Sequence, residues 1–161
     1  MDRTGSLEKT LLLIKPDGVE RNHIEDILSF IRNKTGLRLI FVKSILSPTP
    51  RQIAIHYSVH KKKPFYPWLR KQFLGHGIVA VIYEGPNAVQ SLRDAIGTTD
   101  PAKCDPETTV RGLYRCDTML LSQQEGRATK NTVHASETIE DFLREIEAWF
   151  TKTELHNLGL W

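Results

Sequence analysis

The stretch Leu11-Leu12-Leu13-Ile14-Lys15-Pro16-Asp17-Gly18 joins a short apolar run to a turn signal. An apolar run of this length that ends at turn residues predicts a buried strand. Proline fixes φ, aspartate can bond to its own backbone and glycine tolerates positive φ, so Pro16-Asp17-Gly18 predicts a tight turn. Lys15 is then expected at the last position of the strand, at one end of a sheet.

Helices and strands alternate after this strand. Asn22, with Glu25 three residues on, predicts a capping box for a helix that Gly36 ends. The alternation in residues 37–41 predicts a second strand that reaches about residue 46. Thr49-Pro50-Arg51-Gln52 places a cap, a proline at the first helical position and a glutamine in register, which predicts a helix to about residue 59.

A second short helix, residues 68–74, would complete an αα-hairpin with that helix. The continuous apolar run 78–83 predicts the third strand, and Asn87 predicts the cap of a helix that Gly97 stops. Residues 98–115 show no periodic pattern and predict a long loop, which in a compact domain is usually functional or disordered.

The C-terminal part is expected to supply the last strand and the last helix. Residues 116–121 are interpreted as a fourth strand, and the polar run 123–131 as an insertion. Thr138 with Asp141 predicts a capped helix whose apolar positions follow the helical period as far as Phe150.

This order of elements predicts an α+β fold. Its core is the ferredoxin-like split βαββαβ sandwich, with a four-stranded antiparallel sheet, helices on one face and the αα-hairpin inserted. The chain of 161 residues is expected to form a single domain over residues 1–161, because this length suffices for a core without metals or disulfides.

The composition excludes several classes of protein. Apolar residues make up 40% and charged residues 25% of the chain, as in ordinary soluble globular proteins. The formal net charge of +3 suits an anionic ligand but does not demand nucleic acid. Cys104 and Cys116 form neither a disulfide framework nor a zinc-binding spacing. Because no signal peptide or membrane-length apolar run is seen, we expect a cytoplasmic protein without a membrane partner.

The hexapeptide Asn131-Thr132-Val133-His134-Ala135-Ser136 lies between the polar run and the last predicted helix. This arrangement predicts that His134 lies at the mouth of a helix N-terminus, where free N–H groups and the helix dipole favour an anion. An imidazole there can act as a nucleophile toward phosphate. The alternative, for the hexapeptide alone, is a histidine that packs or caps at the end of a loop. The Walker A, GxGxxG, HExxH and GxSxG motifs are absent from the chain.

Other side chains suited to phosphate are scattered along the sequence. They are Lys15, Arg93, Thr99 and Arg111. Taken singly, each is interpreted as a solvated surface side chain rather than a ligand contact, and Tyr57 and Phe65 as core or helix-packing residues. Glu145, at the edge of the last apolar stripe, could be a half-exposed carboxylate that pairs within its own helix.

Together, and in this order, these residues resemble the nucleoside diphosphate kinase family over nearly the whole chain, from about Glu8 to Phe150. The motifs that carry the resemblance are Lys15-Pro16-Asp17-Gly18-Val19, His56-Tyr57 to Pro64-Phe65, Gly97-Thr98-Thr99-Asp100-Pro101, Arg111-Gly112, Asn131 to Ser136, and Glu145-Ile146 before Trp149-Phe150. K-P-D-G-V near the start, combined with N-x-x-H-x-S before the last helix, is a specific pair of motifs.

The resemblance implies an enzyme that moves the γ-phosphoryl group between nucleoside triphosphates and diphosphates by a ping-pong mechanism, through a phosphohistidine. His134 matches the nucleophile, and Glu145 matches the carboxylate that orients the imidazole. Ser136 matches a hydroxyl near that pair. Lys15 and Tyr57 match the residues beside the transferred phosphoryl group.

The remaining matches concern the nucleotide. Arg93, Thr99 and Arg111 match the clamp on the phosphates, Phe65 and Leu69 the stacking site for the base, and Asn131 the contact to sugar hydroxyl and phosphate. The resemblance also implies Mg²⁺ held mainly by the nucleotide's own phosphates and water, with no metal ligands from the chain. It further implies a homo-oligomer, either a hexamer or a tetramer.

Three departures from the family pattern keep an alternative open. The long loop reads Glu107-Thr108-Thr109-Val110-Arg111-Gly112-Leu113-Tyr114 where the family usually has Pro-Gly-Thr-Ile-Arg-Gly-Asp-Phe. Extra residues are inserted between Arg111 and Asn131, and Ala135 replaces a usual glycine, which matters if that glycine uses positive φ. With the basic surface of residues 61–71, these departures allow a weakly active relative that binds nucleotides or nucleic acid, although nucleic acid is not expected as the main partner.

Overall fold

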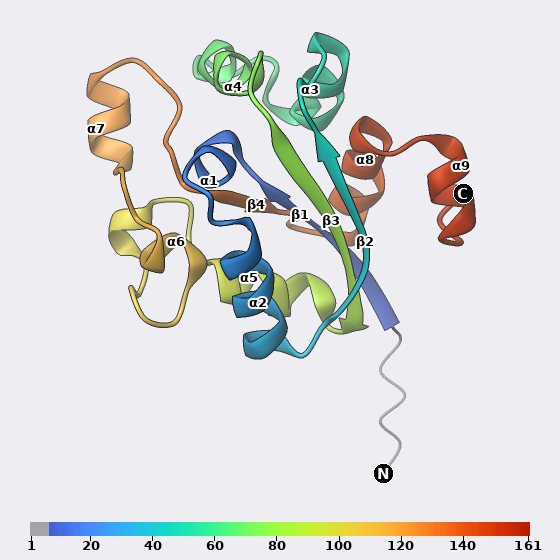
Figure 1. Cartoon of the computed structure of the whole chain (residues 1–161). Coiled ribbons are helices and arrows are strands. Elements are labelled where there is room, and N and C mark those ends of the chain that lie inside the picture. The colour runs from blue at the N-terminus through green and yellow to red at the C-terminus, as the bar shows by residue number, and fades with distance from the viewer. Residues whose placement is uncertain (1–6) are drawn as a thin grey trace.

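The computed structural model describes residues 7–161; residues 1–6, which the single-domain prediction also covers, lie outside the described residues. An antiparallel sheet of four strands runs through the molecule in the order β2-β3-β1-β4 (Figure 1). The strands are β1 (Leu7–Ile14), β2 (Arg38–Ile45), β3 (Ile78–Pro86) and β4 (Val133–Ala135). This is the strand order of the split βαββαβ sandwich, so the predicted α+β fold is confirmed.

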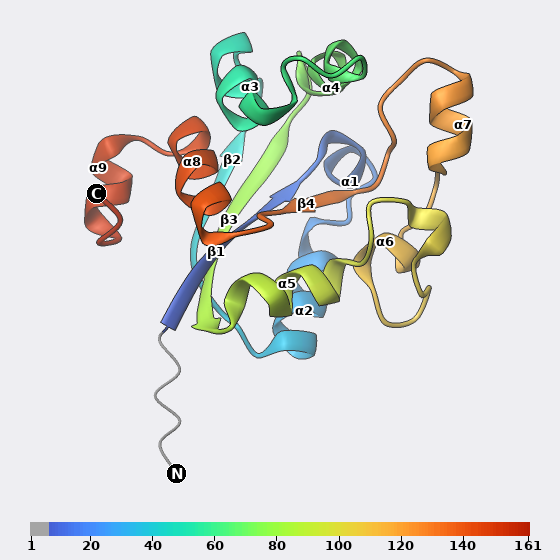
Figure 2. The same ribbon diagram turned by 180° about the vertical axis from the view of Figure 1, so that it is seen from behind.

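Helices cover both faces of the sheet, not one as predicted (Figure 2). Helices α2 (Ile24–Thr35) and α5 (Ala88–Ile96) pack on one face. Helices α3 (Pro50–His56), α8 (Ile139–Trp149) and α9 (Lys152–Asn157) pack on the other. Successive residues of a strand point to opposite faces, and the unbroken apolar run of β1 places Leu12 in one layer and Leu11 and Leu13 in the other. A strand segment in which every position is apolar needs cover on both sides.

The predicted tight turn after β1 is instead a short helix, α1 (Pro16–Glu20). Pro16 takes the first helical position, where its missing N–H costs nothing. Gly18 is needed for space and not for positive φ: a Cβ there would lie 2.9 Å from Ile14 Cγ2 and 3.0 Å from the carbonyl oxygen of Thr132. The glycine therefore lets α1 lie directly against the segment that precedes β4.

Helix α2 and strand β2 differ in detail from the predictions. Asn22 does not cap α2: it adopts a φ of 59°, and the helix begins after His23 without a side-chain cap. The predicted end at Gly36, with a φ of 68°, is confirmed. In β2 a register shift between Leu39 and Phe41 breaks the expected alternation, because a bulge places two residues opposite one partner.

The αα-hairpin is formed by α3 and α4 (Tyr66–Phe73), with the 3₁₀ turn η1 (Ser58–His60) between them. The predicted capping box is present, since Thr49 accepts from the backbone of Gln52 and the Gln52 side chain accepts from the backbone of Thr49. Helix α4 begins two residues before the predicted start at residue 68 and includes Pro67 in its first turn, where proline is tolerated.

The fourth strand is not where the sequence suggested. Thr118, within residues 116–121, caps helix α7 (Met119–Gln124) by accepting from the backbone of Leu121. The strand partner of β1 is β4, three residues long, on the far side of the inserted segment. A strand this short carries too little periodicity to be recognised, and its residues pair with partners 119 to 123 positions away in the sequence.

The remaining elements are short, except α8. The loop after α5 holds the 3₁₀ turn η2 (Pro101–Lys103) and α6 (Val110–Leu113). Thr138 caps α8 by accepting from the backbone of Asp141, as predicted, whereas α9 was not predicted. Between residues 7 and 161 no helix has the length and apolar character needed to cross a bilayer.

Candidate active site

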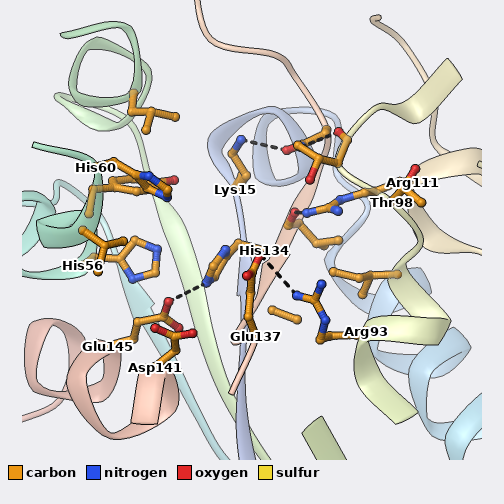
Figure 3. A pocket seen from close by; sticks show the side chains of 18 of the residues that line it. Lys15, His56, His60, Arg93, Thr98, Arg111, His134, Glu137, Asp141 and Glu145 are labelled. Atoms are coloured by element: carbon orange, nitrogen blue, oxygen red, sulfur yellow. Dashed lines mark hydrogen bonds and ion pairs between the residues drawn. The ribbon is translucent and has the colours of Figure 1, made fainter. Parts of the chain in front are cut away.

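A cleft with a volume of about 500 Å³ opens where the ends of β1 and β4 meet the α3–α4 hairpin (Figure 3). The loop after α5 forms the opposite wall, and α8 adds Asp141, Arg144 and Glu145. The cleft brings together ten of the eleven predicted site residues, namely Lys15, Tyr57, Phe65, Leu69, Arg93, Thr99, Arg111, Asn131, His134 and Glu145. The eleventh, Ser136, lies fully buried directly behind Glu145.

His134 is the middle residue of β4, opposite Leu13 of β1. The prediction that it lies at the mouth of a helix is wrong, because α8 begins only at Ile139. Strand pairing, and not a helix terminus, fixes its backbone. About a fifth of its side chain, 22%, is exposed, so the ring is neither packed away nor a loop-end cap and is open to the cleft.

Glu145 holds one side of the His134 ring. Its Oε1 lies 3.1 Å from His134 Nε2, and its Oε2 accepts a 2.6 Å hydrogen bond from Ser136 Oγ. Burial by itself raises the pKa of this carboxyl group, but the facing His134 and the two hydrogen bonds outweigh it and hold the pKa below its usual range. With 4% of its surface exposed, Glu145 is not the half-exposed helix residue of the alternative interpretation.

His56 packs edge-on against His134, with ring centroids 4.7 Å apart. Trp149 Nε1 donates to His56 Nδ1 at 3.2 Å, so the neutral ring carries its proton on Nε2. Burial lowers the pKa of His56 well below the usual value, which keeps the ring uncharged beside His134.

Lys15 reaches the cleft from the position directly after β1, one residue beyond the predicted strand position, where it is the N-cap residue of α1. Its Nζ donates to Asn131 Oδ1 at 2.8 Å and to the carbonyl oxygen of Thr129 at 3.3 Å. Burial lowers the pKa of this ammonium group to about 8, with the charge of Asp17 opposing the shift and that of Arg111 adding to it. The side chain is 4% exposed and lies within 4 Å of no carboxylate oxygen among residues 7–161.

Arg111 is a second buried cation on the opposite wall. It donates to the carbonyl oxygens of Gly97 and Val133, each at 2.9 Å, and burial lowers its pKa to about 10. Its Nε is buried without a hydrogen-bond partner, and in the described part of the chain no acid pairs with it. Two buried cations without acidic partners favour an incoming anion, because each has lost water and gained no counter-charge.

Other predicted residues lie at the rim. Arg93 of α5 pairs with Glu137 at 3.5 Å. Thr99 is exposed, and its carbonyl oxygen accepts from Asn131 Nδ2 at 3.0 Å. Phe65 is 38% exposed at the start of α4, as a stacking residue must be. Tyr57 is buried at the hairpin base, where burial raises its pKa.

The backbone just before β4 is strained. Thr132 adopts a φ of 69°, which is unfavourable for a β-branched residue. Its N–H donates to Asp17 Oδ2 at 2.8 Å, and its carbonyl accepts from the backbone N–H of Lys15, also at 2.8 Å. These bonds tie α1 to the approach of β4 and fix Lys15 relative to His134.

Comparisons with known proteins agree with this geometry. The family model described as nucleoside diphosphate kinase matches residues 8–155. The chain belongs to the nucleoside diphosphate kinase family. A nucleoside diphosphate kinase of Picrophilus torridus is 38% identical over 149 residues, which cover 92% of this chain and 99% of that protein. One from Staphylococcus epidermidis is 39% identical over 150 residues, covering 92% and 91%.

Solved structures of the family show the same fold. The transition-state mimic of the Borrelia burgdorferi nucleoside-diphosphate kinase with bound vanadate and ADP matches with a TM-score of 0.84 and 28% identity, covering 92% of this chain and 89% of that one. A nucleoside diphosphate kinase family protein from Babesia bovis matches with a TM-score of 0.76 and 35% identity, covering 91% and 90%.

The departures from the family pattern leave the cleft complete. Ala135 pairs with Leu12 in the sheet and keeps a negative φ, so the alanine causes no strain. The altered loop forms α6, capped by Thr109, and still delivers Arg111 to the cleft. The inserted residues form α7 and the segment that leads back to Asn131.

The sequence reasoning missed several cleft residues. His56 was noted only within a motif and Asp141 only as a helix-capping partner, and His60, Glu137 and Arg144 were not singled out. The position of His56 directly before Tyr57 was the available signal, whereas a lone histidine in a helix usually packs in a core. The roles of the others depend on where the fold places them, as the 3.5 Å ion pair of Glu137 with Arg93 of α5 shows.

One group of side chains in the described part of the chain has metal-ligand character. Nitrogens of His56 and His134 and an oxygen of Glu145 lie within 4.8 Å of one another. This set does not fit Mg²⁺, which prefers an octahedron of oxygen ligands. Because His56 Nδ1 accepts from Trp149, its Nε2 carries the proton and has no lone pair to coordinate a metal.

Proposed function

We propose that this protein transfers the γ-phosphoryl group from a nucleoside triphosphate to a nucleoside diphosphate by a ping-pong mechanism, with His134 as the phosphoryl carrier. One observation supports this most: a histidine held by a buried carboxylate faces two buried cations that pair with no acid among residues 7–161. That arrangement suits a multiply charged phosphate chain whose last phosphorus meets the imidazole.

The chemistry follows from which nitrogen is free. Nε2 of His134 carries the proton and donates to Glu145, which leaves the lone pair on Nδ1. Nδ1 attacks the γ-phosphorus in line, the Nδ1–P bond forms, and the bond from phosphorus to the bridging oxygen breaks, releasing the diphosphate. Glu145 stabilises the positive charge that develops on the ring, and Ser136 holds the carboxylate in place. The second nucleotide takes the phosphoryl group by the reverse of these steps.

The remaining cleft residues would act on the nucleotide. Lys15 and the hydroxyl of Tyr57 offset charge on the transferred group, and Arg93, Thr99 and Arg111 clamp the inner phosphates. Phe65 stacks on the base with Leu69 beside it, and Asn131 bonds to sugar and phosphate. Stacking tolerates any base, which supports broad nucleotide use.

Several broader properties belong to the same proposal. Mg²⁺ binds through the nucleotide's phosphates and water, since the chain offers it no oxygen-ligand cage in the described residues. The chain acts as one domain in the cytoplasm and assembles into a hexamer or tetramer. Support for assembly comes from β2, an edge strand whose Leu39 and Val42 are 41% and 44% exposed.

The test is to incubate the protein with γ-labelled ATP and to isolate the labelled protein. We expect a phosphoenzyme that is labile in acid and stable in alkali, as a phosphohistidine is. In His134→Ala the label should be lost while nucleotide binding persists. An unchanged chain that takes up no label would refute the proposal.

The alternative, a weakly active module that binds nucleotides or nucleic acid, has one observation in its favour. Lys61, Lys62, Lys63, Arg70 and Lys71 are all exposed on the hairpin. The altered loop is a weaker argument for this alternative, because the long loop still brings Arg111 and Thr99 into the cleft. Tight binding of nucleic acid with a steep salt dependence, together with negligible phosphoryl exchange, would favour it.

A further inference from the structure

The inserted segment, residues 117–130, is closed by contacts at its base. Asp117, 5% exposed, accepts from two nitrogens of Arg127, at 3.0 Å for Nη2, and from the backbone N–H of Lys130 at 2.8 Å. A bidentate guanidinium–carboxylate pair sets distance and angle together. We name this pair, Asp117 with Arg127, the latch. It brings the two ends of the segment together just before Asn131.

The segment is also held from inside. Ser122 Oγ lies 2.7 Å from Thr129 Oγ1, and the backbone N–H of Arg127 donates to the carbonyl oxygen of Ser122 at 3.0 Å. Asp100 accepts from the backbone N–H of Met119 at 3.2 Å, which anchors α7 to the loop after α5. The course of residues 127–130 is therefore fixed by the latch and by α7.

One backbone group of this segment reaches two walls of the cleft. The carbonyl oxygen of Thr129 accepts from Lys15 Nζ at 3.3 Å and from Gln72 Nε2 at 3.2 Å. Lys15 follows β1 directly and lines the cleft, whereas Gln72 belongs to α4, the helix that carries Leu69. A carbonyl oxygen has two lone pairs, so it can hold both donors at once.

We propose that segment 117–130 is a positioning element for the reaction, in which the latch sets the Thr129 carbonyl and this carbonyl orients Lys15 and holds α4 at the cleft. This proposal rests on the proposed function, because the reaction in which the segment positions Lys15 is the phosphoryl transfer proposed above. It assigns to the insertion a role in phosphoryl transfer and in nucleotide affinity. Asp117, Arg127 and Gln72 are positioning residues, because they act through Thr129 and Lys15 and not on the substrate.

The first experiment removes the latch. Arg127→Ala should slow phosphoenzyme formation from ATP in single-turnover kinetics by about tenfold to a hundredfold, the range expected when a reacting group is misplaced by about 1 Å. Arg127→Lys, which keeps a charged donor, should recover part of the loss. The control is Lys43→Ala, which breaks the 2.7 Å ion pair with Glu154 on the α9 side of the sheet and should leave the rate unchanged.

The second experiment removes Gln72, which is the donor to the Thr129 carbonyl besides Lys15. Gln72→Leu keeps the latch and Lys15 but frees α4 from Thr129, so it should raise KM several-fold more than it lowers kcat. Gln124→Leu, an exposed glutamine at the end of α7, is the matched control and should change neither. Because the latch acts on α4 through the same Thr129 carbonyl to which Gln72 donates, the effects of Arg127→Ala and Gln72→Leu on nucleotide affinity should be less than additive in the double variant.

A pH profile separates an effect of the latch on Lys15 from a loss of stability. The titratable and charged groups that face Lys15 are Asp17 in α1, Arg111 in α6 and Asp117 in the latch. Asp117→Asn should therefore move the basic limb of kcat/KM to lower pH, because it removes a charge that raises the pKa of Lys15. A change in thermal stability alone would leave that limb in place.

The outcomes distinguish this inference from the proposed function. The segment is only structural, and the inference fails, if Arg127→Ala lowers the melting temperature but changes the rate and the nucleotide affinity by less than twofold and leaves the basic limb of kcat/KM at the same pH. If that variant does not fold, Gln72→Leu decides, and an unchanged KM overturns the inference. If the unchanged chain forms no phosphoenzyme, the proposed function fails, and calorimetric binding of a nucleoside diphosphate to the same variants still tests the positioning of α4.

Discussion

Glu145 uses both of its oxygens within the site, one toward His134 and one toward Ser136. A carboxylate fixed at two points can hold a ring in one tautomer, which an exposed and mobile side chain cannot do. The oxygen that faces His134, Glu145 Oε1, also lies 3.7 Å from Nη2 of Arg144. The positive charge of Arg144 favours the ionised carboxylate. The three groups keep a negative charge next to a ring that becomes positive during transfer.

Replacing Glu145 by Gln should therefore lower the rate of phosphoenzyme formation by roughly tenfold to a hundredfold, less than the loss of His134, since partners that orient a reacting group typically matter at that level. The amide keeps the size of the side chain but not its charge. Rapid-quench measurement with labelled ATP checks this. Glu147→Gln, two residues further along the same helix and exposed, is the control. An unaltered rate in Glu145→Gln would contradict the orienting role.

Lys15 predicts how the activity depends on pH. Its lowered pKa of about 8 means that the free enzyme loses the ammonium charge as the pH rises through about 8. We expect kcat/KM to fall there, whereas kcat at saturating nucleotide should fall at higher pH because bound phosphate favours the charged form. A Lys15→Ala variant should be slow and lack this limb. A wild-type profile that stays flat from pH 7 to pH 10 would rule out the role.

At the scale of elements, the site depends on how closely α1, β1 and β4 approach one another. Gly18 of α1 lies against the carbonyl of Thr132, and Thr132 leads directly into β4. The hydrogen bonds of Thr132 with Lys15 and Asp17 span this contact. The strained φ of Thr132 is maintained because both neighbouring elements hold it.

Gly18→Ala should therefore destabilise the fold by about 1 to 3 kcal/mol, as overpacking of a tight contact does. It should also lower activity, because the approach to His134 must move. Urea denaturation and phosphoryl exchange measure the two effects. Gly77→Ala is the matched control: its added Cβ would meet nothing closer than 3.7 Å, and we expect a change within about 0.5 kcal/mol. Equal stability of the two variants would show that the contact is not tight.

At the scale of the whole molecule, the edge of the sheet formed by β2 is suited to association between copies of the chain. In the sheet, β2 is an outer strand, and its exposed Leu39 and Val42 lie beside a smaller groove lined by Leu28, Arg32 and Tyr83. Unpaired strand groups together with apolar side chains are a common basis for pairing between copies.

Sedimentation equilibrium should accordingly give a mass that is a multiple of the 18.4 kDa chain, and Val42→Glu should lower it. The charge would be buried at an interface formed by β2, at a cost that association cannot offset. The control is Leu120→Glu, which adds the same charge on α7 at a residue that is 66% exposed and should leave the mass unchanged. A monomeric mass for the unchanged chain would refute the proposed assembly.

Much of the fold and the content of the site could be predicted from the sequence. The capping box at Thr49, the cap at Thr138 and the helix ends at Gly36 and Gly97 depend on residues within one turn of each other, so local patterns suffice. The fourth strand was misplaced because Thr118 starts a helix and β4 is only three residues long. The second helical layer was missed because an apolar run shows that a strand is buried but not what covers it.

The sequence by itself determined which side chains are available for the proposed function: one histidine with its carboxylate, three cations suited to phosphate and an aromatic residue suited to the base, in an order specific to one family. Only the tertiary structure decided that His134 lies on a strand and not at a helix end, that Lys15 and Arg111 are buried without counter-charges, and that the insertion bonds to Lys15. The physical reason is the distance along the sequence over which each kind of interaction acts. Caps and periodicity act over a few residues, whereas burial and these contacts join positions more than twenty residues apart, and the tertiary packing of all the elements fixes them together.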